Sequence, residues 1–151
     1  MNHNELYDRA LQIAIQAHQG QKDKSGRDYI MHPIRVAERC KDPKAKIVAL
    51  LHDTIEDTHI TADFLRSEGF PDEIVDGVLS VTKREGEDYD TFVHRAAQNA
   101  IGREVKMADL EDNMDIRRLK EIAEDDVARL RKYLRAWQYL ICPTVTSFRK
   151  N

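Results

Sequence analysis

The sequence has few of the features that mark secreted, membrane-bound or polyanion-binding proteins. Its two cysteines, Cys40 and Cys142, lie far apart and form no Cys-x-x-Cys motif, so we expect two unrelated packing thiols in a reducing compartment. It has no run of about 18 apolar residues, so no segment is expected to span a membrane. The start, Met-Asn-His-Asn-Glu, lacks the basic and apolar regions of a signal peptide. A cytoplasmic location is therefore expected.

The chain also lacks the excess of positive charge that a nucleic-acid polymer requires. It carries 24 Lys and Arg against 27 Asp and Glu, a net charge of −3. Binding to a phosphate backbone needs a basic surface, so the charge argues against DNA or RNA as the main partner. A small phosphorylated ligand fits this charge, because a few local cations are enough to bind it.

The residues that are present predict one all-α domain. Hydrophobic residues make up 41% of the chain and charged residues 34%, which is typical of a globular protein with one core. Apolar residues recur at helical spacing in almost every segment, without an internal repeat, a linker or a convincing alternating strand. We predict a domain over residues 1–142 and a frayed tail over residues 143–151. Helices are expected to begin after Asn2 or Asn4, at Pro43, after Thr61, at Pro71, near Phe92, near Val105 and at Asp125.

One stretch, residues 49–58, combines an apolar run with four ionisable groups. His52 and Asp53 are adjacent, and Glu56 and Asp57 follow within one helical turn. Residues four apart share a helix face, so we expect His52 to stand over Glu56 and Asp53 over Asp57. Crowding these groups beside buried apolar neighbours is costly unless a cation compensates them. The stretch therefore indicates a metal site.

Two other segments supply candidate ligands for this metal. His32 lies just before Pro33 at a loop-to-helix junction, and Asp109 is a single carboxylate in an apolar stretch. The predicted ligands are His32, His52, Asp53 and Asp109. This mixture of imidazole and carboxylate suits Mn, Fe, Ni or Zn better than Ca, and open positions would hold water or a substrate oxygen.

The same residues also allow a purely structural interpretation. His52 is then a core histidine, Asp109 pairs with a lysine, and the two acids after Asp53 cap the following segment. Glu111 and Asp112 lie off the face shared by Asp109 and Asn113, and we expect them on a solvated helix face.

The sequence resembles the HD superfamily of metal-dependent phosphohydrolases in three ordered motifs: His32-Pro33, His52-Asp53 with Glu56-Asp57, and Ala108-Asp109 with Asn113. More narrowly, it resembles the guanosine tetraphosphate hydrolase domain of the Rel/Spo type, including stand-alone small alarmone hydrolases. The likeness extends from about His18 to Leu119 and also includes Gly20-Gln21, Lys24-Ser25-Gly26, Tyr29-Ile30 and Val81-Thr82-Lys83. Several motifs in register are more specific than any one of them.

The resemblance implies a compact HD-domain helical bundle with a metal site, typically manganese, in its core. It implies that the four predicted ligands bind the metal and that Glu56 and Asp57 position and activate the attacking water. The implied reaction removes the 3′-pyrophosphate from guanosine tetra- or pentaphosphate, with Asn113 near the nucleotide. Lys24 and Lys106 lie beside motif residues and are the cations we expect to steady the polyphosphate.

Two departures from this pattern leave the substrate open. Asp23 stands where the family usually has arginine, and Asp115 and Ile116 follow Asn113 where the family tends to have a basic residue and a threonine. The alternatives are an HD phosphohydrolase for another phosphorylated metabolite and a non-catalytic nucleotide-binding regulatory domain. Cations of the last helices leave a homo-oligomer open as well.

Overall fold

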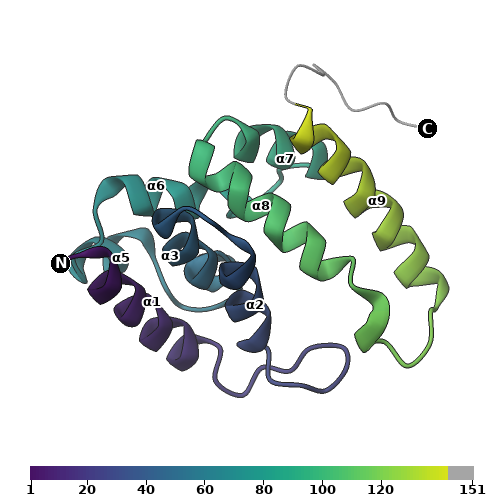
Figure 1. Ribbon diagram of the computed structural model, residues 1–151, viewed down its shortest axis with the longest axis horizontal. Helices are drawn as coiled ribbons and strands as arrows, with labels where there is room; N and C mark the ends of the chain where they lie inside the picture. The colour runs from purple at the N-terminus through teal and green to yellow at the C-terminus, as the bar shows by residue number, and fades with distance from the viewer. Residues whose placement is uncertain (143–151) are drawn as a thin grey trace.

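The computed structural model describes residues 1–142, and these form an all-helical bundle (Figure 1), as predicted. Within them the single β-type pairing is an isolated bridge between Lys22 and Asp28. The helices are α1 (His3–Ala17), α2 (Met31–Arg39), α3 (Pro43–Leu51), α4 (Thr54–Asp57), α5 (Ala62–Ser67), α6 (Asp72–Ser80), α7 (Tyr89–Ala97), α8 (Ala100–Asn113), the 3-10 helix η1 (Ile116–Arg118) and α9 (Glu124–Ile141). The predicted tail, residues 143–151, lies outside the described residues.

Side-chain caps explain why several helices begin where the sequence predicts. The Asn2 side chain accepts the Glu5 N–H at 3.0 Å while the Glu5 carboxylate accepts the Asn2 N–H at 2.8 Å, which forms a capping box for α1. Asp42 accepts the Lys44 N–H at 2.8 Å ahead of Pro43, the first residue of α3. Thr61 caps α5 in the same way. These three predicted starts are confirmed.

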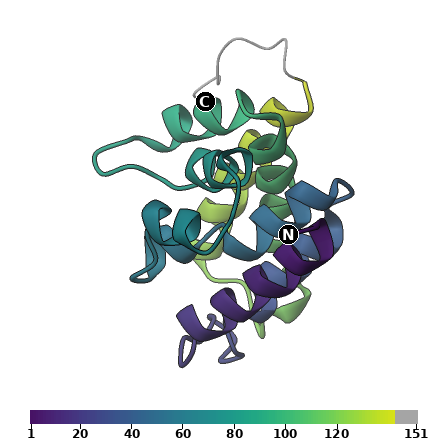
Figure 2. The same cartoon turned by 90° about the vertical axis from the view of Figure 1, so that its left-hand side faces the viewer.

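Helix α3 is the buried centre of the bundle. Its residues Ala45 and 47–51 have no exposed surface, and α1, α2, α6 and α8 pack around it. Figure 2, turned by 90°, shows α1 lying across the outside of this group. A helix that is apolar on all sides is stable only when neighbours cover every face. The core therefore holds rigidly the end of α3, where His52 follows.

The structure corrects the prediction that residues 49–58 form one helix. Helix α3 ends at Leu51, His52 and Asp53 form a turn, and α4 is a separate single turn. The Thr54 hydroxyl donates to the Leu51 carbonyl at 2.8 Å, a local bond that competes with regular helical pairing. His52 and Asp53 therefore lie at the junction between two helices.

Two later helices begin earlier than the apolar pattern indicates. Helix α7 begins at Tyr89 because the Asp88 side chain accepts the Thr91 N–H. Helix α8 begins at Ala100, five residues before Val105, because the Asn99 side chain accepts the Gly102 N–H at 2.9 Å. Asparagine and aspartate caps set these boundaries, although the first turns are less apolar.

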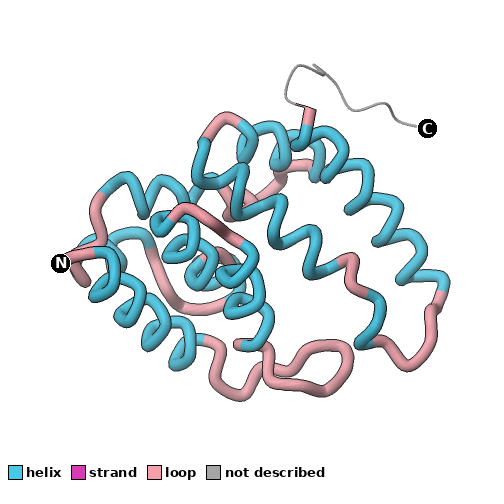
Figure 3. The backbone as a smooth tube through the Cα atoms, in the orientation of Figure 1, coloured by secondary structure: helices cyan, strands magenta, loops and turns pink. Residues whose placement is uncertain are grey.

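Helix α9 packs on α7 and α8 through a small second core made of Val93, Leu110, Ala136, Tyr139 and Leu140. The loop over residues 18–30 and the segment after α8 lie at the same end of the bundle (Figure 3). No helix among residues 1–142 combines the length and the apolar character that a bilayer span requires.

Candidate metal centre and substrate pocket

Three separate parts of the fold bring the four predicted metal ligands together. His32 lies in the first turn of α2, His52 and Asp53 lie between α3 and α4, and Asp109 lies on α8. One ligand atom each from His32, His52 and Asp109 lie within 4.8 Å of one another. Asp53 joins them: its Oδ2 is 3.1 Å from His52 Nε2 and 3.8 Å from His32 Nε2. The Tyr29 hydroxyl donates a hydrogen bond to the same Asp53 oxygen.

The orientation of His52 fits a metal ligand. Its Nδ1 lies 2.6 Å from the Ala49 carbonyl oxygen, which can only accept, so the proton is on Nδ1. The other ring nitrogen, Nε2, is buried and makes no hydrogen bond. It nevertheless lies 3.1 Å from Asp53 and 3.4 Å from Asp109. Two carboxylates facing one ring nitrogen is an arrangement that suits a divalent cation, because the cation can be bound by the nitrogen and by both carboxylates.

The acid–base properties of the cluster show the same demand for positive charge. Burial lowers the pKa of His52, but Asp53 and Asp109 outweigh burial and hold this pKa well above its usual value. Burial raises the pKa of Asp53, yet His52 brings it down to about 2. Burial likewise raises the pKa of Asp109, and Lys106 with His32 holds it well below its usual value. Both carboxylates are therefore anions at neutral pH.

Lys106 has a different position from the one predicted. Its buried ammonium lies 3.0 Å from Asp109 Oδ2 and 4.8 Å from the centre of the Phe92 ring. It is not among the described residues that line the pocket beside the metal centre. Asp109 therefore pairs with a lysine, as the structural interpretation expects. The same carboxylate group also faces His32 and His52.

Glu56 and Asp57 are exposed on α4, which begins directly after the candidate ligand Asp53. The Glu56 carboxylate accepts the Lys83 N–H at 2.8 Å, which ties α4 to the loop after α6. Burial, Asp53 and Glu56 raise the pKa of Asp57 to about 6. A carboxylate with a pKa near neutrality can both accept and return a proton.

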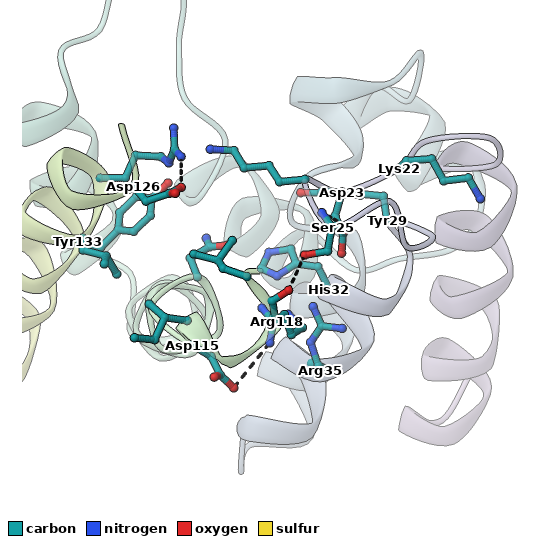
Figure 4. Close-up of a pocket in the computed structure, with 16 residues that line it drawn as sticks. Lys22, Asp23, Ser25, Tyr29, His32, Arg35, Asp115, Arg118, Asp126 and Tyr133 are labelled. Atoms are coloured by element: carbon teal, nitrogen blue, oxygen red, sulfur yellow. Dashed lines mark hydrogen bonds and ion pairs between the residues drawn. The ribbon is translucent and has the colours of Figure 1, made fainter. Parts of the chain in front are cut away.

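A pocket of about 310 Å³ opens beside the metal centre between the 18–30 loop, η1 and α9 (Figure 4). Lys24 and Asn113, for which a contact with substrate is predicted, line this pocket, and Asn113 Nδ2 donates to Asp109 Oδ1 at 3.0 Å. Other side chains of the wall are Lys22, Tyr29, His32, Arg35, Arg118, Arg129 and Tyr133. The pocket residues of α9 were not predicted from the sequence, because helical spacing alone does not reveal which polar face meets a distant loop.

The two aspartates that depart from the family pattern already have partners. Asp23 Oδ1 accepts the Ser25 N–H at 2.8 Å and the Arg27 N–H at 2.9 Å, so it shapes its own loop. Asp115 lies 2.7 Å from Arg117 and 3.6 Å from Arg118. The two arginines offset much of the charge of Asp115, whereas the partners of Asp23 are uncharged backbone N–H groups.

Asp112 contradicts the prediction of a solvated position. Its side chain is completely buried, and it accepts hydrogen bonds from His32 and Arg35. Burial raises the pKa of Asp112, but these partners lower it to about 2. Asp112 is three residues after Asp109, and residues at this spacing are neighbours on a helix. That spacing was the sequence signal for its inward position.

The helical bundle and its histidine and aspartate cluster define an HD-type domain with a candidate metal site. The family model described as HD domain matches residues 10–138, so the chain belongs to the HD domain family. The family that the sequence motifs resemble is therefore confirmed.

Longer proteins contain segments similar to this chain. It is 38% identical over 136 residues to a GTP pyrophosphokinase of Streptomyces coelicolor, covering 81% of this chain and 16% of that protein. It is 34% identical over 124 residues to a guanosine-3′,5′-bis(diphosphate) 3′-pyrophosphohydrolase of Aquifex aeolicus, covering 74% and 18%. The chain thus spans less than a fifth of the length of these curated relatives.

A solved structure has the same fold. This structure, described as "A metazoan ortholog of SpoT hydrolyzes ppGpp and plays a role in starvation responses", matches the present chain with a TM-score of 0.74. The match covers 95% of this chain and 89% of that one at 21% identity, a likeness of fold.

Proposed function

We propose that this domain is a metal-dependent phosphohydrolase of the guanosine 3′,5′-bis(diphosphate) 3′-pyrophosphohydrolase type. The observation that carries the proposal is the cluster of buried His32, His52 and Asp109 with the partly buried Asp53, which lies next to a pocket lined with cations. A relative that is 34% identical bears the name of this hydrolase. The substrate class is therefore a small phosphorylated nucleotide, with no nucleic-acid polymer or membrane as partner.

In this proposal the four clustered side chains hold one divalent cation, with manganese as the expected metal. When bound, such a cation lowers the pKa of a water molecule and offsets charge on phosphoryl oxygens. Lys106 keeps Asp109 ionised through their contact of 3.0 Å. It therefore acts on the substrate indirectly.

Glu56 and Asp57 are proposed to position the attacking water and accept its proton. The bond from the Lys83 N–H fixes the Glu56 carboxylate, and the raised pKa of Asp57, about 6, suits proton transfer near neutral pH. A domain that only binds nucleotides has no need of these two acids beside a metal centre. Their position supports an enzyme over a regulatory module.

The pocket cations are proposed to bind the phosphate groups of the nucleotide. Lys24 and Arg129 lie on opposite walls, one on the loop and one on α9, and Asn113 connects the pocket to Asp109. Arginine and lysine donors bind phosphate oxygens through charge-assisted hydrogen bonds. Asn113 is proposed to contact the nucleoside.

A second candidate is hydrolysis of another phosphorylated metabolite by the same metal centre. The observation in its favour is that three carboxylates line the pocket: Asp23, Asp115 and Asp126. They reduce the positive potential offered to a substrate with many phosphates.

The proposal also includes a cytoplasmic location and allows a homo-oligomer.

The test is manganese-supplemented hydrolysis of guanosine tetraphosphate beside a panel of nucleotides, with the product identified as phosphate or pyrophosphate. The proposal expects pyrophosphate from guanosine tetraphosphate, and loss of turnover in Asp109→Ala. Cleavage of a different ester with inert guanosine tetraphosphate would select the second candidate. No cleavage of any ester by a chain that binds manganese would contradict both.

A further inference from the structure

We infer that Asp112 is a positioning residue whose buried carboxylate holds His32 in the tautomer and orientation required for metal binding. The inference rests on the proposed metal-dependent function and concerns a residue outside the predicted ligand set. It depends on hydrogen-bond geometry around one imidazole ring.

The two nitrogens of the His32 ring face two different carboxylates. Nδ1 lies 2.7 Å from Asp112 Oδ2, and Nε2 lies 3.0 Å from Asp109 Oδ1 on the side of the metal cluster. A metal ligand needs its lone pair on the nitrogen facing the cation. In a neutral imidazole the single proton must then be on Nδ1, where Asp112 accepts it.

The Asp112 carboxylate is buried and therefore needs partners that compensate its charge. Its side chain has 0% exposure, and an isolated ionised carboxylate at such a site is strongly destabilising. Arg35 compensates the charge with two contacts, from Nε at 2.9 Å and from Nη2 at 3.2 Å. Because Arg35 offsets the charge, the carboxylate can stay ionised beside His32 and act as a strong acceptor.

The same carboxylate links the metal ligand to the wall of the pocket. Arg118 Nη2 donates to the Asp112 carbonyl at 2.9 Å and lies 3.4 Å from its Oδ2. The Ser25 hydroxyl in turn donates to the Arg118 carbonyl at 2.9 Å, and both residues line the pocket (Figure 4). His32, α2, η1 and the 18–30 loop are thus held by one connected set of hydrogen bonds centred on Asp112.

The test compares Asp112→Leu and Asp112→Asn with Asp115→Asn as a matched control. Asp115 is an aspartate three residues after Asp112 that contacts two arginines and no histidine. Mn²⁺ affinity is measured by titration calorimetry on folded protein, as verified by circular dichroism. The His32 tautomer is read from imidazole ¹⁵N shifts of the metal-free and Zn²⁺-loaded chain, with His32→Gln used to assign the signal.

Asp112→Leu is expected to lower Mn²⁺ affinity by about 10- to 100-fold and to remove the Nδ1–H pattern of His32. Asp112→Asn keeps a neutral acceptor, so it should lose less affinity and retain the tautomer. It also keeps the test possible if the leucine variant does not fold. Asp115→Asn should bind Mn²⁺ as the wild type does.

Wild-type affinity and unchanged His32 shifts in folded Asp112 variants would overturn the inference and leave the proposed hydrolase intact. An equal loss of affinity in Asp115→Asn would also overturn it, because general electrostatics would then explain the effect. A wild-type chain that binds no Mn²⁺ or Zn²⁺ would overturn the proposed function together with the inference.

Discussion

Replacing Glu87 with glutamine should destabilise the protein, and the loss should depend on pH in a defined way. The Arg95 guanidinium donates to both Glu87 carboxylate oxygens at 2.9 Å, and the Glu87 side chain is 7% exposed. Arg95 also donates to the Leu79 and Thr82 carbonyls. The pair therefore closes the loop between α6 and α7, where the Lys83 N–H holds Glu56.

The hydrogen bond from Arg95 lowers the pKa of Glu87 from 4.5 to about 2. This change sets an upper limit of about 3 kcal/mol on the contribution of Glu87 to the free energy of unfolding, and solvent screening at a loop reduces that contribution to about 1–2 kcal/mol. Because the pKa is lower in the folded state, the unfolded chain binds more protons between these two values. The stabilisation is therefore complete above about pH 5 and is lost as the pH falls toward about 2.

The assay is urea unfolding of the wild type and Glu87→Gln between pH 7 and pH 3, with the difference in unfolding free energy plotted against pH. At pH 3 the difference should be less than half of its value at pH 7. Other acids that titrate in this range are common to both proteins and cancel. Glu85→Gln, an exposed acid in the same loop, is the control and should show almost no difference. A constant difference down to pH 3, or none at pH 7, would refute the reasoning.

Three further predictions concern the metal centre and the packing of α8. Asp53→Ala and Asp109→Ala should each abolish stoichiometric Mn²⁺ binding, as measured by metal analysis after gel filtration; unchanged metal content would contradict the ligand assignment. Glu56→Ala should keep its metal while turnover falls by about 10²–10⁴-fold in the hydrolysis assay, and full activity would exclude it as a base. Gly102→Ala should cost about 1–3 kcal/mol in urea unfolding, because its methyl group would overlap the Ser80 hydroxyl; wild-type stability would mean that Ser80 moves freely.

Local chemistry made the helix starts predictable from sequence. The caps at Asn2, Asp42 and Thr61 act within four residues, so the sequence alone contains both partners of each hydrogen bond. The break after Leu51 was not predicted, because apolar periodicity continues across it. The competing bond from Thr54 to Leu51 decides the geometry there.

Long-range contacts explain what sequence analysis missed around the site. Arg35 and Asp112 are 77 residues apart, and no local pattern indicates that a guanidinium neutralises that carboxylate. Without a visible partner, an aspartate in an acidic run is expected to face solvent. The cluster of His32, His52 and Asp109 was predictable because the resemblance to a known family implies that these residues, which are far apart in the sequence, bind one metal.

The candidate metal centre and the proposed recognition surface lie on different parts of the fold, and this division explains how the predicted ligands can match the family pattern while Asp23 and Asp115 depart from it. His52 and Asp109 follow or belong to helices of the main core, α3 and α8, whose packing leaves no room for variation. The pocket wall is formed instead by a loop, a 3-10 helix and one face of α9. Asp23 shapes that loop and Asp115 binds its own arginines. Under the proposed function, substitutions at these positions can therefore change which phosphate ester binds while the predicted ligand set stays in place.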